Sequence, residues 1–537
     1  GWGAADLKYR FNWNFPLMFS RHDPDKLYAA GNVLFKTIDV GQTWQAISPD
    51  LTRNEKEKQA ASGGEITKDN TGVEYYGTIF AIAESLLEPG VLWAGSDDGL
   101  LHLSRDGGAS WSDVTPRGLP RDIQINSIDA HPFEAGGLYL AATAYKSDDF
   151  RPYLFRSTDY GRSWKAISKG IPDDEFSRVI RADPERRELL YAGTERGAWF
   201  SRDDGATWRP LQLDLPIVPV TDMAVRDGHL VVATQGRGYW MFDHLHLLRQ
   251  ANEDSFGESP ELFEPASVLR LSNRRAEDPG NQGSNPSTGA VLHYWLPDPL
   301  PADSALELVI AEADGTVIRR FTRKEDEAED DEPPLGDDDR LLTADAGLNR
   351  LEWDLRYPSV ERFEKLVLWN DYLNGPRVVP GRYTARLQVN DSSEQVAIEV
   401  LPDPRSDAGS EELQRQFEFT WDINRKLTET HRAITRLRSA RKQLTAIAGR
   451  VEGQDEFMPI SDRAGALVSQ LDDIEEALYQ TRLEARQDPL NFPIRLNDKL
   501  AGVMLNASIG DHAPTDAAIA VRDELVAAID ARLAELD

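Results

Sequence analysis

The sequence predicts a multidomain, mainly β chain: an Asp-box β-propeller or part of one, then an Ig-like β-sandwich, then an α-helical hairpin or bundle. Three observations predict it. An eight-residue motif recurs four times within the first 250 residues. Apolar and polar residues alternate between 265 and 403, and apolar residues follow a helical period from 409 onward. The predicted parts are residues 1–250, a linker at 251–264, a sandwich at 265–403 and a helical domain at 409–537.

The recurring motif has the pattern Ser/Thr-x-Asp-x-Gly-x-x-Trp, the Asp box, and each copy follows a short apolar strand pattern. The carboxylate can accept backbone N–H groups across a tight turn, the glycine supplies a positive φ, and the tryptophan covers the hairpin. Successive motif aspartates are 67, 53 and 44 residues apart, a spacing that suits four-stranded propeller blades. A catalytic pair would be singular, so these periodic residues are predicted to be structural. They are Asp39, Trp44, Asp106, Trp111, Asp159, Trp164, Asp203 and Trp208.

A fifth unit at 230–243 keeps the strand pattern but lacks the motif glycine and tryptophan. The first unit begins abruptly at the start of the chain. We therefore expect an open propeller that leaves an apolar face near Tyr9, Phe11 and Trp13. The expected cover is another polypeptide, either an upstream propeller fragment of the same precursor or a second protein chain.

Charge and composition exclude several classes of function. The 537 residues include 91 acidic and 60 basic side chains, a net charge of −31, which disfavours general binding to nucleic acid or anionic membranes. The chain has no cysteine, which excludes disulfides, thiolate metal sites and cysteine nucleophiles. No apolar run approaches the roughly 18 residues of a membrane span. The opening Gly1-Trp2-Gly3 has neither an initiator Met nor a signal peptide, as expected of a processed product or a fragment.

The sandwich region contains one strongly acidic run, residues 325–340, with ten acidic residues and two prolines. It is predicted to be a mobile loop because it cannot bury a core. No cofactor is predicted except that this loop could hold a structural calcium ion, although it lacks the carboxylate spacing of an EF-hand. In the helical region, one apolar stripe runs from Leu427 to Ile447 and a second follows a Ser461 cap. A short helix around Leu500 and another from Thr515 complete the prediction.

No P-loop, HExxH, G-x-S-x-G or nucleotide-binding fingerprint occurs. His244 and His246 alternate along a predicted strand and could ligate a metal. No third ligand is evident nearby, so packing or solvent exposure is expected and no metal site is predicted.

The candidate ligand-binding residues lie in predicted inter-strand turns, which should cluster on one face of the propeller. Aromatic residues there could stack on sugars or clamp a peptide. The alternative is that these residues have no ligand and only pack within the blades or lie in solvated turns. The candidates are Asp97, Asp98, Tyr145, Asp148, Asp149, Glu195, Arg196, Arg237 and Tyr239. Catalytic residues are not assigned.

The Asp-box units resemble those of exported bacterial proteins described as sortilin N-terminal-like or BNR-repeat glycosyl hydrolase-like. The resemblance rests on segments 9–14, 47–54, 190–195 and 232–240, and on 347–354 and 493–500 in the C-terminal half. It implies an extracytoplasmic protein, periplasmic, outer-surface or secreted. Members are usually longer, with more propeller upstream, so this chain resembles their C-terminal half. Sortilin's Cys-rich module is excluded because the chain has no cysteine.

Two functions follow as hypotheses. The first is a module that binds a peptide, protein or glycan on one propeller face, with the other domains as spacers or docking surfaces. The alternative is a glycoside hydrolase acting on polysaccharide. Similar two-propeller xyloglucan-degrading enzymes use one Asp from each propeller, so this chain would supply one side of the cleft. A purely structural subunit is a third hypothesis. Whether the chain is an enzyme stays open, with binding favoured.

Overall fold

The computed structural model describes residues 3–252, 255–271, 285–323, 337 and 339–536. The chain divides into two compact units, Gly1–Arg249 and Gln250–Asp537. No described helix is long and apolar enough to cross a membrane.

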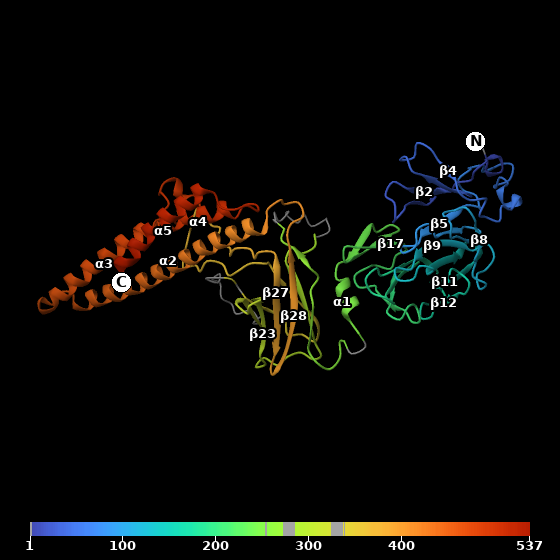
Figure 1. The fold of residues 1–537 in the computed structure, drawn as a ribbon. Coiled ribbons are helices and arrows are strands. Elements are labelled where there is room, and N and C mark those ends of the chain that lie inside the picture. Colours follow the sequence, from blue (N-terminus) through green and yellow to red (C-terminus); the bar gives the residue numbers. More distant parts are fainter. Residues whose placement is uncertain (1–2, 253–254, 272–284, 324–336, 338, 537) are drawn as a thin grey trace. The chain divides into compact units, whose positions relative to one another are not determined.

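The first unit consists of small antiparallel sheets whose strands pair in chain order (Figure 1). The first sheet comprises β1 (Leu17–Phe19), β2 (Leu27–Ala30), β3 (Leu34–Thr37) and β4 (Gln45–Ala46), and the second β5 (Ile79–Glu84), β6 (Leu92–Ser96), β7 (Leu101–Ser104) and β8 (Ser112–Asp113). The third comprises β9 (Gln124–Ala130), β10 (Leu138–Ala144), β11 (Asp149–Ser157) and β12 (Lys165–Ala166). The fourth comprises β13 (Ser177–Ala182), β14 (Leu190–Thr194), β15 (Ala198–Ser201) and β16 (Arg209–Pro210). The last has three strands, β17 (Val220–Arg226), β18 (His229–Thr234) and β19 (Tyr239–Phe242), and leads into helix α1 (Leu245–Gln250).

These sheets pack on one another in the order in which they occur in the chain. Every residue of β6, β10 and β14 is buried, because the second strand of a sheet lies between two neighbouring sheets. Each apolar cluster joins consecutive sheets; one contains Trp93 of β6 and Leu140 of β10, for example. A succession of short four-stranded meanders packed face to face is a propeller-like arrangement.

The Asp-box turns join the third and fourth strands of the first four sheets, and the four copies make the same bonds. In the fourth copy, Asp203 Oδ1 accepts the Thr207 N–H at 2.8 Å and Oδ2 accepts the Thr207 hydroxyl at 2.6 Å. The Ser201 hydroxyl donates to Asp203 Oδ1 at 2.8 Å and accepts the Gly205 N–H. The residue after each aspartate has a positive φ; in the first copy this is Val40, at 59°. These bonds lower the pKa of each motif aspartate, that of Asp39 to about 2.

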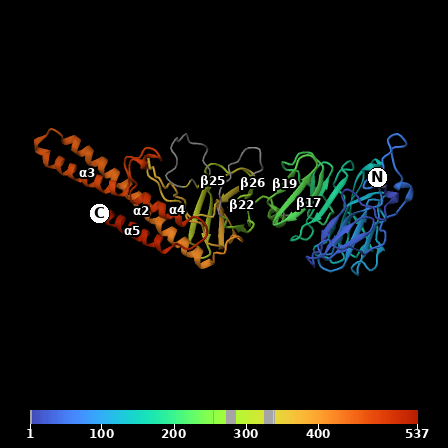
Figure 2. The same ribbon diagram turned by 90° about the horizontal axis from the view of Figure 1, so that it is seen from above.

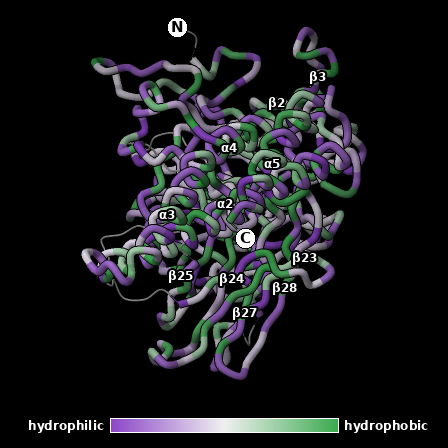
Figure 3. The backbone as a smooth tube through the Cα atoms, turned by 90° about the vertical axis from the view of Figure 1, so that its left-hand side faces the viewer, coloured by the Kyte–Doolittle hydropathy of each residue, from purple (hydrophilic) through white to green (hydrophobic). Residues whose placement is uncertain are grey.

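The β part of the second unit has two sheets over one core. The smaller has strand order β20 (Glu261–Phe263), β22 (Ala290–Leu296), β26 (Gly347–Trp353). The larger has the order β21 (Val268–Leu269), β28 (Ser392–Leu401), β27 (Gly381–Val389), β23 (Leu306–Glu312), β24 (Val317–Arg323), β25 (Arg340–Leu342). Hydrophobic and hydrophilic positions alternate along β27 and β28 (Figure 3), and one apolar cluster contains Tyr294 of the smaller sheet and Leu387 of the larger.

Two features of this β part differ from the prediction. Residues 251–264 were expected to be a linker, but Leu262 of β20 is buried in the core of the sandwich. Residues 360–373 were placed in the sandwich, yet Val360, Phe363 and Leu373 pack with the helices. The reason is composition: this irregular segment carries apolar side chains without the period-two alternation of a strand. The predicted calcium loop at 325–340 lies mostly outside the described residues; its described Asp337 and Asp339 pair with Arg319.

The helices are α2 (Ser410–Val451), α3 (Met458–Leu478), α4 (Leu496–Ala507) and α5 (Asp516–Leu536). α2 and α3 lie side by side (Figures 1 and 2), and their buried stripes meet α4 and α5 around Ile434, Ile474 and Leu500. Ser461 was predicted to cap this helix, but the structure places it inside α3. α3 already begins at Met458 with Pro459 in its first turn, a position where a missing N–H is tolerated.

Candidate functional site

The predicted ligand residues lie in the loops between the second and third strands of successive sheets. Asp97 and Asp98 follow β6, Asp148 lies between β10 and β11, Asp149 is the first residue of β11, and Glu195 follows β14. Arg196 lies beside Glu195, and Arg237 precedes β19. The structure therefore places these residues at equivalent positions of successive sheets, but their environments differ sharply.

Asp97 and Asp98 were expected to face a ligand, and the structure contradicts this, because their residues are only 4% and 3% exposed. Asp97 accepts the N–H groups of Gly77 and Thr78 at 2.9 Å and the Thr78 hydroxyl at 2.7 Å. Asp98 accepts the N–H of Arg53 at 2.8 Å. Burial raises the pKa of Asp97 to about 6 despite these donors. Asp98 thus holds the segment after β4 of the first sheet, and Asp97 holds the segment directly before β5 of its own sheet.

An exposed aromatic group lies in the loops of the third and fourth sheets. The Tyr145 ring stacks on Phe176, with centroids 4.9 Å apart and planes inclined by 15°, and Phe150 lies 6.2 Å from Phe176. The Arg178 guanidinium lies 5.1 Å from the Phe176 ring centroid, and the Lys146 ammonium lies 6.0 Å from that of Tyr145. We call these five residues the Tyr145 platform.

The platform combines a buried base with an accessible upper surface. Phe176 is 4% exposed, whereas Tyr145 and Phe150 are 37% and 44% exposed. Glu195 holds Arg178 at 2.6 Å and so fixes the cation beside the rings. Lys146 also lies 5.8 Å from the ring of Tyr76, which precedes β5, so the second and third sheets meet at this cation. Such a surface can stack on an apolar or sugar ring and donate hydrogen bonds at its rim.

The remaining candidates are engaged in ion pairs or stand apart. Asp149 accepts from Arg151 and from the Tyr153 hydroxyl, both at 2.7 Å, which holds its pKa well below the usual range. Arg196 pairs with Asp174 at 3.1 Å. Tyr239 is 82% exposed, and no described aromatic ring stacks on it.

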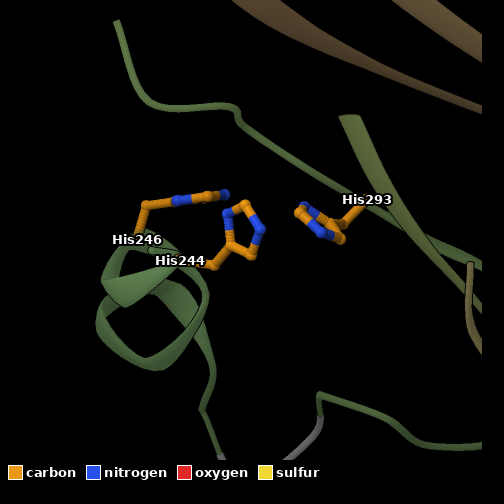
Figure 4. A group of neighbouring side chains, drawn as sticks. All are labelled: His244, His246 and His293. Carbon is orange, nitrogen blue, oxygen red and sulfur yellow. The ribbon is translucent and has the colours of Figure 1, made fainter. Parts of the chain in front are cut away.

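The histidines lie at the start of helix α1, not on the predicted strand. His244 immediately precedes α1 and His246 lies in its first turn, with rings 5.6 Å apart and nearly perpendicular at 86° (Figure 4). The strand ends at Phe242 and the chain turns into α1, so the alternation in sequence does not give a shared strand face. His293, also labelled in Figure 4, lies on β22 of the second unit.

Sequence reasoning missed Phe176, Arg178 and Tyr76. Each lies close to the start of the first strand of a sheet, at the same end as the candidate loops, and inspection of the segments before the first strands would have found them. Of the five platform residues only Tyr145 was predicted; Lys146 and Phe150, which are close to it in the sequence, were missed as well.

Comparison with known proteins gives weak similarities. No family model matches the chain. A xyloglucanase, Xgh74A of Acetivibrio thermocellus, is 26% identical over 147 residues, which is 23% of this chain and 17% of that protein. The chain thus matches less than a fifth of the length of this curated relative.

Solved structures with detectable similarity include the GH74 xyloglucanase from Xanthomonas campestris, with 16% identity, coverage of 70% of this chain and 62% of that one, and a TM-score of 0.34. YCF48 bound to D1 peptide has 16% identity, covers 44% and 67% of the two chains, and has a TM-score of 0.28. Because both TM-scores are low, these structures do not support a fold assignment. The description of the first unit as propeller-like rests on its own sheets.

Proposed function

We propose that the first unit is a ligand-binding module of an exported protein, and that the Tyr145 platform is where a glycan or peptide binds. The observation that carries the proposal is the exposed Tyr145 ring stacked on buried Phe176 and flanked by fixed cations. A pre-stacked ring loses little conformational freedom on binding, and that reduces the entropic cost of association. The Asp-box residues would be structural, and the second unit, with its Ig-like sandwich and helices, would serve as a spacer or docking surface.

A glycan is the favoured ligand within this proposal because the partial sequence match is to a xyloglucanase. Planar aromatic faces stack on the apolar faces of sugar rings, while Arg178 and Lys146 can donate to hydroxyl groups. A peptide could use the same ring and cations, so the test compares xyloglucan oligosaccharides with extended peptides.

The test is isothermal titration calorimetry of the full chain with each ligand class. Tyr145→Ala should weaken binding by about 3–10-fold, as expected for one aromatic contact of about 1 kcal/mol. Tyr239→Ala removes an exposed tyrosine outside the platform and serves as the matched control. Equal affinities of wild type and Tyr145→Ala for every bound ligand would overturn the proposal.

Glycoside hydrolysis is the second candidate, favoured by the same match to Xgh74A. A hydrolase needs two carboxylates about 5–9 Å apart across the scissile bond. In this chain Asp97, Asp98, Asp149 and Glu195 already accept hydrogen bonds from the protein, which supports binding over hydrolysis. Release of reducing ends from xyloglucan by the purified chain would favour the enzyme.

A further inference from the structure

Three arginine side chains of the second unit converge where its sandwich meets its helices. Arg270 directly follows β21. Arg356 and Arg377 are partners in an isolated antiparallel bridge between the segment after β26 and the segment before β27. All three line one pocket of about 500 Å³. Its lining also includes Leu271, Leu355, Tyr372, Asn374, Leu505 and Ile509.

The base of this pocket is held in place by hydrogen bonds. Arg270 is only 3% exposed, and its guanidinium donates to the Val378 carbonyl at 2.9 Å and to Gln416 Oε1 at 3.2 Å. Gln416 of α2 in turn donates to two backbone carbonyls at the end of α4 and just after it, each at 2.9 Å. Arg270 and Arg377 both pair with Asp511. Strands and helices thus fix the arginines before any ligand arrives.

The surroundings of the pocket carry an excess of positive charge. Asp511 is buried and shared by two arginines. Asp354 lies at the rim, with its side chain 59% exposed and Oδ2 3.9 Å from Arg356 Nε. Asp403, also near, pairs with Arg405 at 2.6 Å, so this pair adds no net charge. Among the described residues around the pocket, three guanidinium groups therefore oppose two carboxylates, a local sum of +1 in a chain of net charge −31.

The crowding of these charges has an electrostatic cost. Burial and the neighbouring charge of Arg270 lower the pKa of Arg377 to about 10, even though Asp511 acts in the opposite direction. An arginine with this pKa is still protonated at neutral pH, so the positive charge remains in the pocket. A bound anion would offset the cost of keeping it there.

Two of the arginines also keep donors that the protein does not use. Arg356 Nη1 donates to the Gly375 carbonyl at 2.7 Å and to the Tyr372 hydroxyl at 3.3 Å. Arg377 Nη1 donates to the Leu271 carbonyl at 2.9 Å, and its Nη2 donates to the shared carboxylate at 3.0 Å. Within the described part of the chain, no acceptor lies within hydrogen-bond distance of Arg356 Nη2 or Arg377 Nε. These groups can donate to a ligand.

We propose that this pocket binds a small ring-bearing carboxylate, held between Arg356 and Arg377. The fork of a guanidinium matches the two oxygens of a carboxylate, and a local charge of +1 suits a monoanion better than a dianionic phosphate. The ring of the ligand packs against the apolar part of the lining, Leu355, Leu505 and Ile509. A pocket of about 500 Å³ has room for such a ring as well as for the anionic group.

Isothermal titration calorimetry of the full chain with matched probes provides the test. The probes are D-glucuronate and benzoate, their neutral counterparts D-glucose and benzyl alcohol, and inorganic phosphate. At least one of the two carboxylates should bind at least ~10-fold more tightly than its neutral counterpart, which cannot form the charge-assisted hydrogen bonds. It should also bind more tightly than phosphate, which has no ring to pack on the apolar lining.

Two substitutions at one exposed position locate the bound carboxylate. Ile509 lines the pocket and is 61% exposed, so a polar residue there leaves the fold intact. Ile509→Glu adds a negative charge beside the arginines and should weaken carboxylate binding at least ~10-fold relative to Ile509→Gln, which has nearly the same size and no charge. Arg356→Gln should cause a similar loss, with circular dichroism as the check of its fold. Arg350→Gln is its control, because Arg350 of β26 is exposed and does not line the pocket.

Several outcomes would overturn the proposal. One is a pair of carboxylates that bind no more tightly than their neutral counterparts, and another is phosphate that binds as tightly as they do. Equal carboxylate affinities of Ile509→Glu and Ile509→Gln would place the probe elsewhere and so refute the assignment. Tyr145→Ala should leave carboxylate binding unchanged, because the proposal does not depend on ligand binding at the Tyr145 platform. Loss of carboxylate binding in that variant would also overturn it.

Discussion

Replacing Trp208 by alanine should destabilise the fourth sheet much more than the same replacement at Trp44. Trp208 is 5% exposed, packs in a cluster with Ile171 and Ile180, and donates to the Ile167 carbonyl. Loss of a large buried ring costs about 3–5 kcal/mol, and a buried carbonyl left without a donor accounts for about 1–3 kcal/mol of such losses. Trp44 occupies the same motif position but is 42% exposed, so its replacement should cost about 0.5 kcal/mol or less.

The assay is native-state hydrogen exchange in increasing urea, read by mass spectrometry on peptides from β13–β16 for Trp208→Ala and from β1–β4 for Trp44→Ala. Local exchange separates the first unit from the second, which need not unfold with it. Equal losses of opening free energy for Trp208→Ala and Trp44→Ala would refute the argument that the contact with the preceding sheet is what the motif tryptophan contributes.

Four further predictions follow from other contacts. Asp203→Ala should lower the free energy of unfolding by about 1–3 kcal/mol through loss of charge-assisted turn bonds, while ligand affinity of the folded protein is unchanged in calorimetry. Asp511→Asn should cost about 3–5 kcal/mol in urea unfolding, because buried Arg270 and partly buried Arg377 both pair with this carboxylate; a loss below 1 kcal/mol would contradict that role. The folded pKa of Asp97, about 6, lies above its unfolded value near 4, so its contribution is present at low pH and is lost as pH rises from about 4 to 6. Asp97→Asn should therefore flatten the decline in stability over that window, and an unchanged slope would count against it. Circular dichroism should show that a fragment of residues 356–537 unfolds more cooperatively than one of 409–537, because Val360, Phe363 and Leu373 complete the helical core.

Much of the fold could be predicted from the sequence because its signals are periodic. Four Asp boxes mark four hairpins, and the fifth unit loses its box where the chain turns into α1. The apolar stripes through Ile434 and Leu500 lie on helices that share one core, as their spacing indicates. Ser461 misled because a serine before an apolar stripe resembles a cap, whereas Pro459 was the better signal for the start of the helix.

The candidate site was less accessible to sequence reasoning because burial there depends on contacts between sheets. Asp97 has the composition of a surface turn residue, yet Gly77 and Thr78 from the segment before β5 enclose it. Tyr145 was predicted as a candidate, but its partner Phe176 lies 31 positions later and no local pattern connects them. Residues 360–373 have no regular period, so only tertiary packing assigns them to the helical core.

The direction of the tryptophan contacts has a consequence for biosynthesis. The indoles of Trp111, Trp164 and Trp208 donate to the carbonyls of Ile47, Val114 and Ile167, each just after the fourth strand of the preceding sheet. Each indole lies later in the chain than its carbonyl, by 64, 50 and 41 residues. During translation, from the amino terminus onward, a newly made sheet keeps a bare apolar edge until the hairpin of the next sheet has left the ribosome. The sheets are therefore covered one at a time, in chain order, as the nascent chain emerges. A ribosome that pauses shortly before Trp111, Trp164 or Trp208 leaves one sheet uncovered and accessible to chaperones.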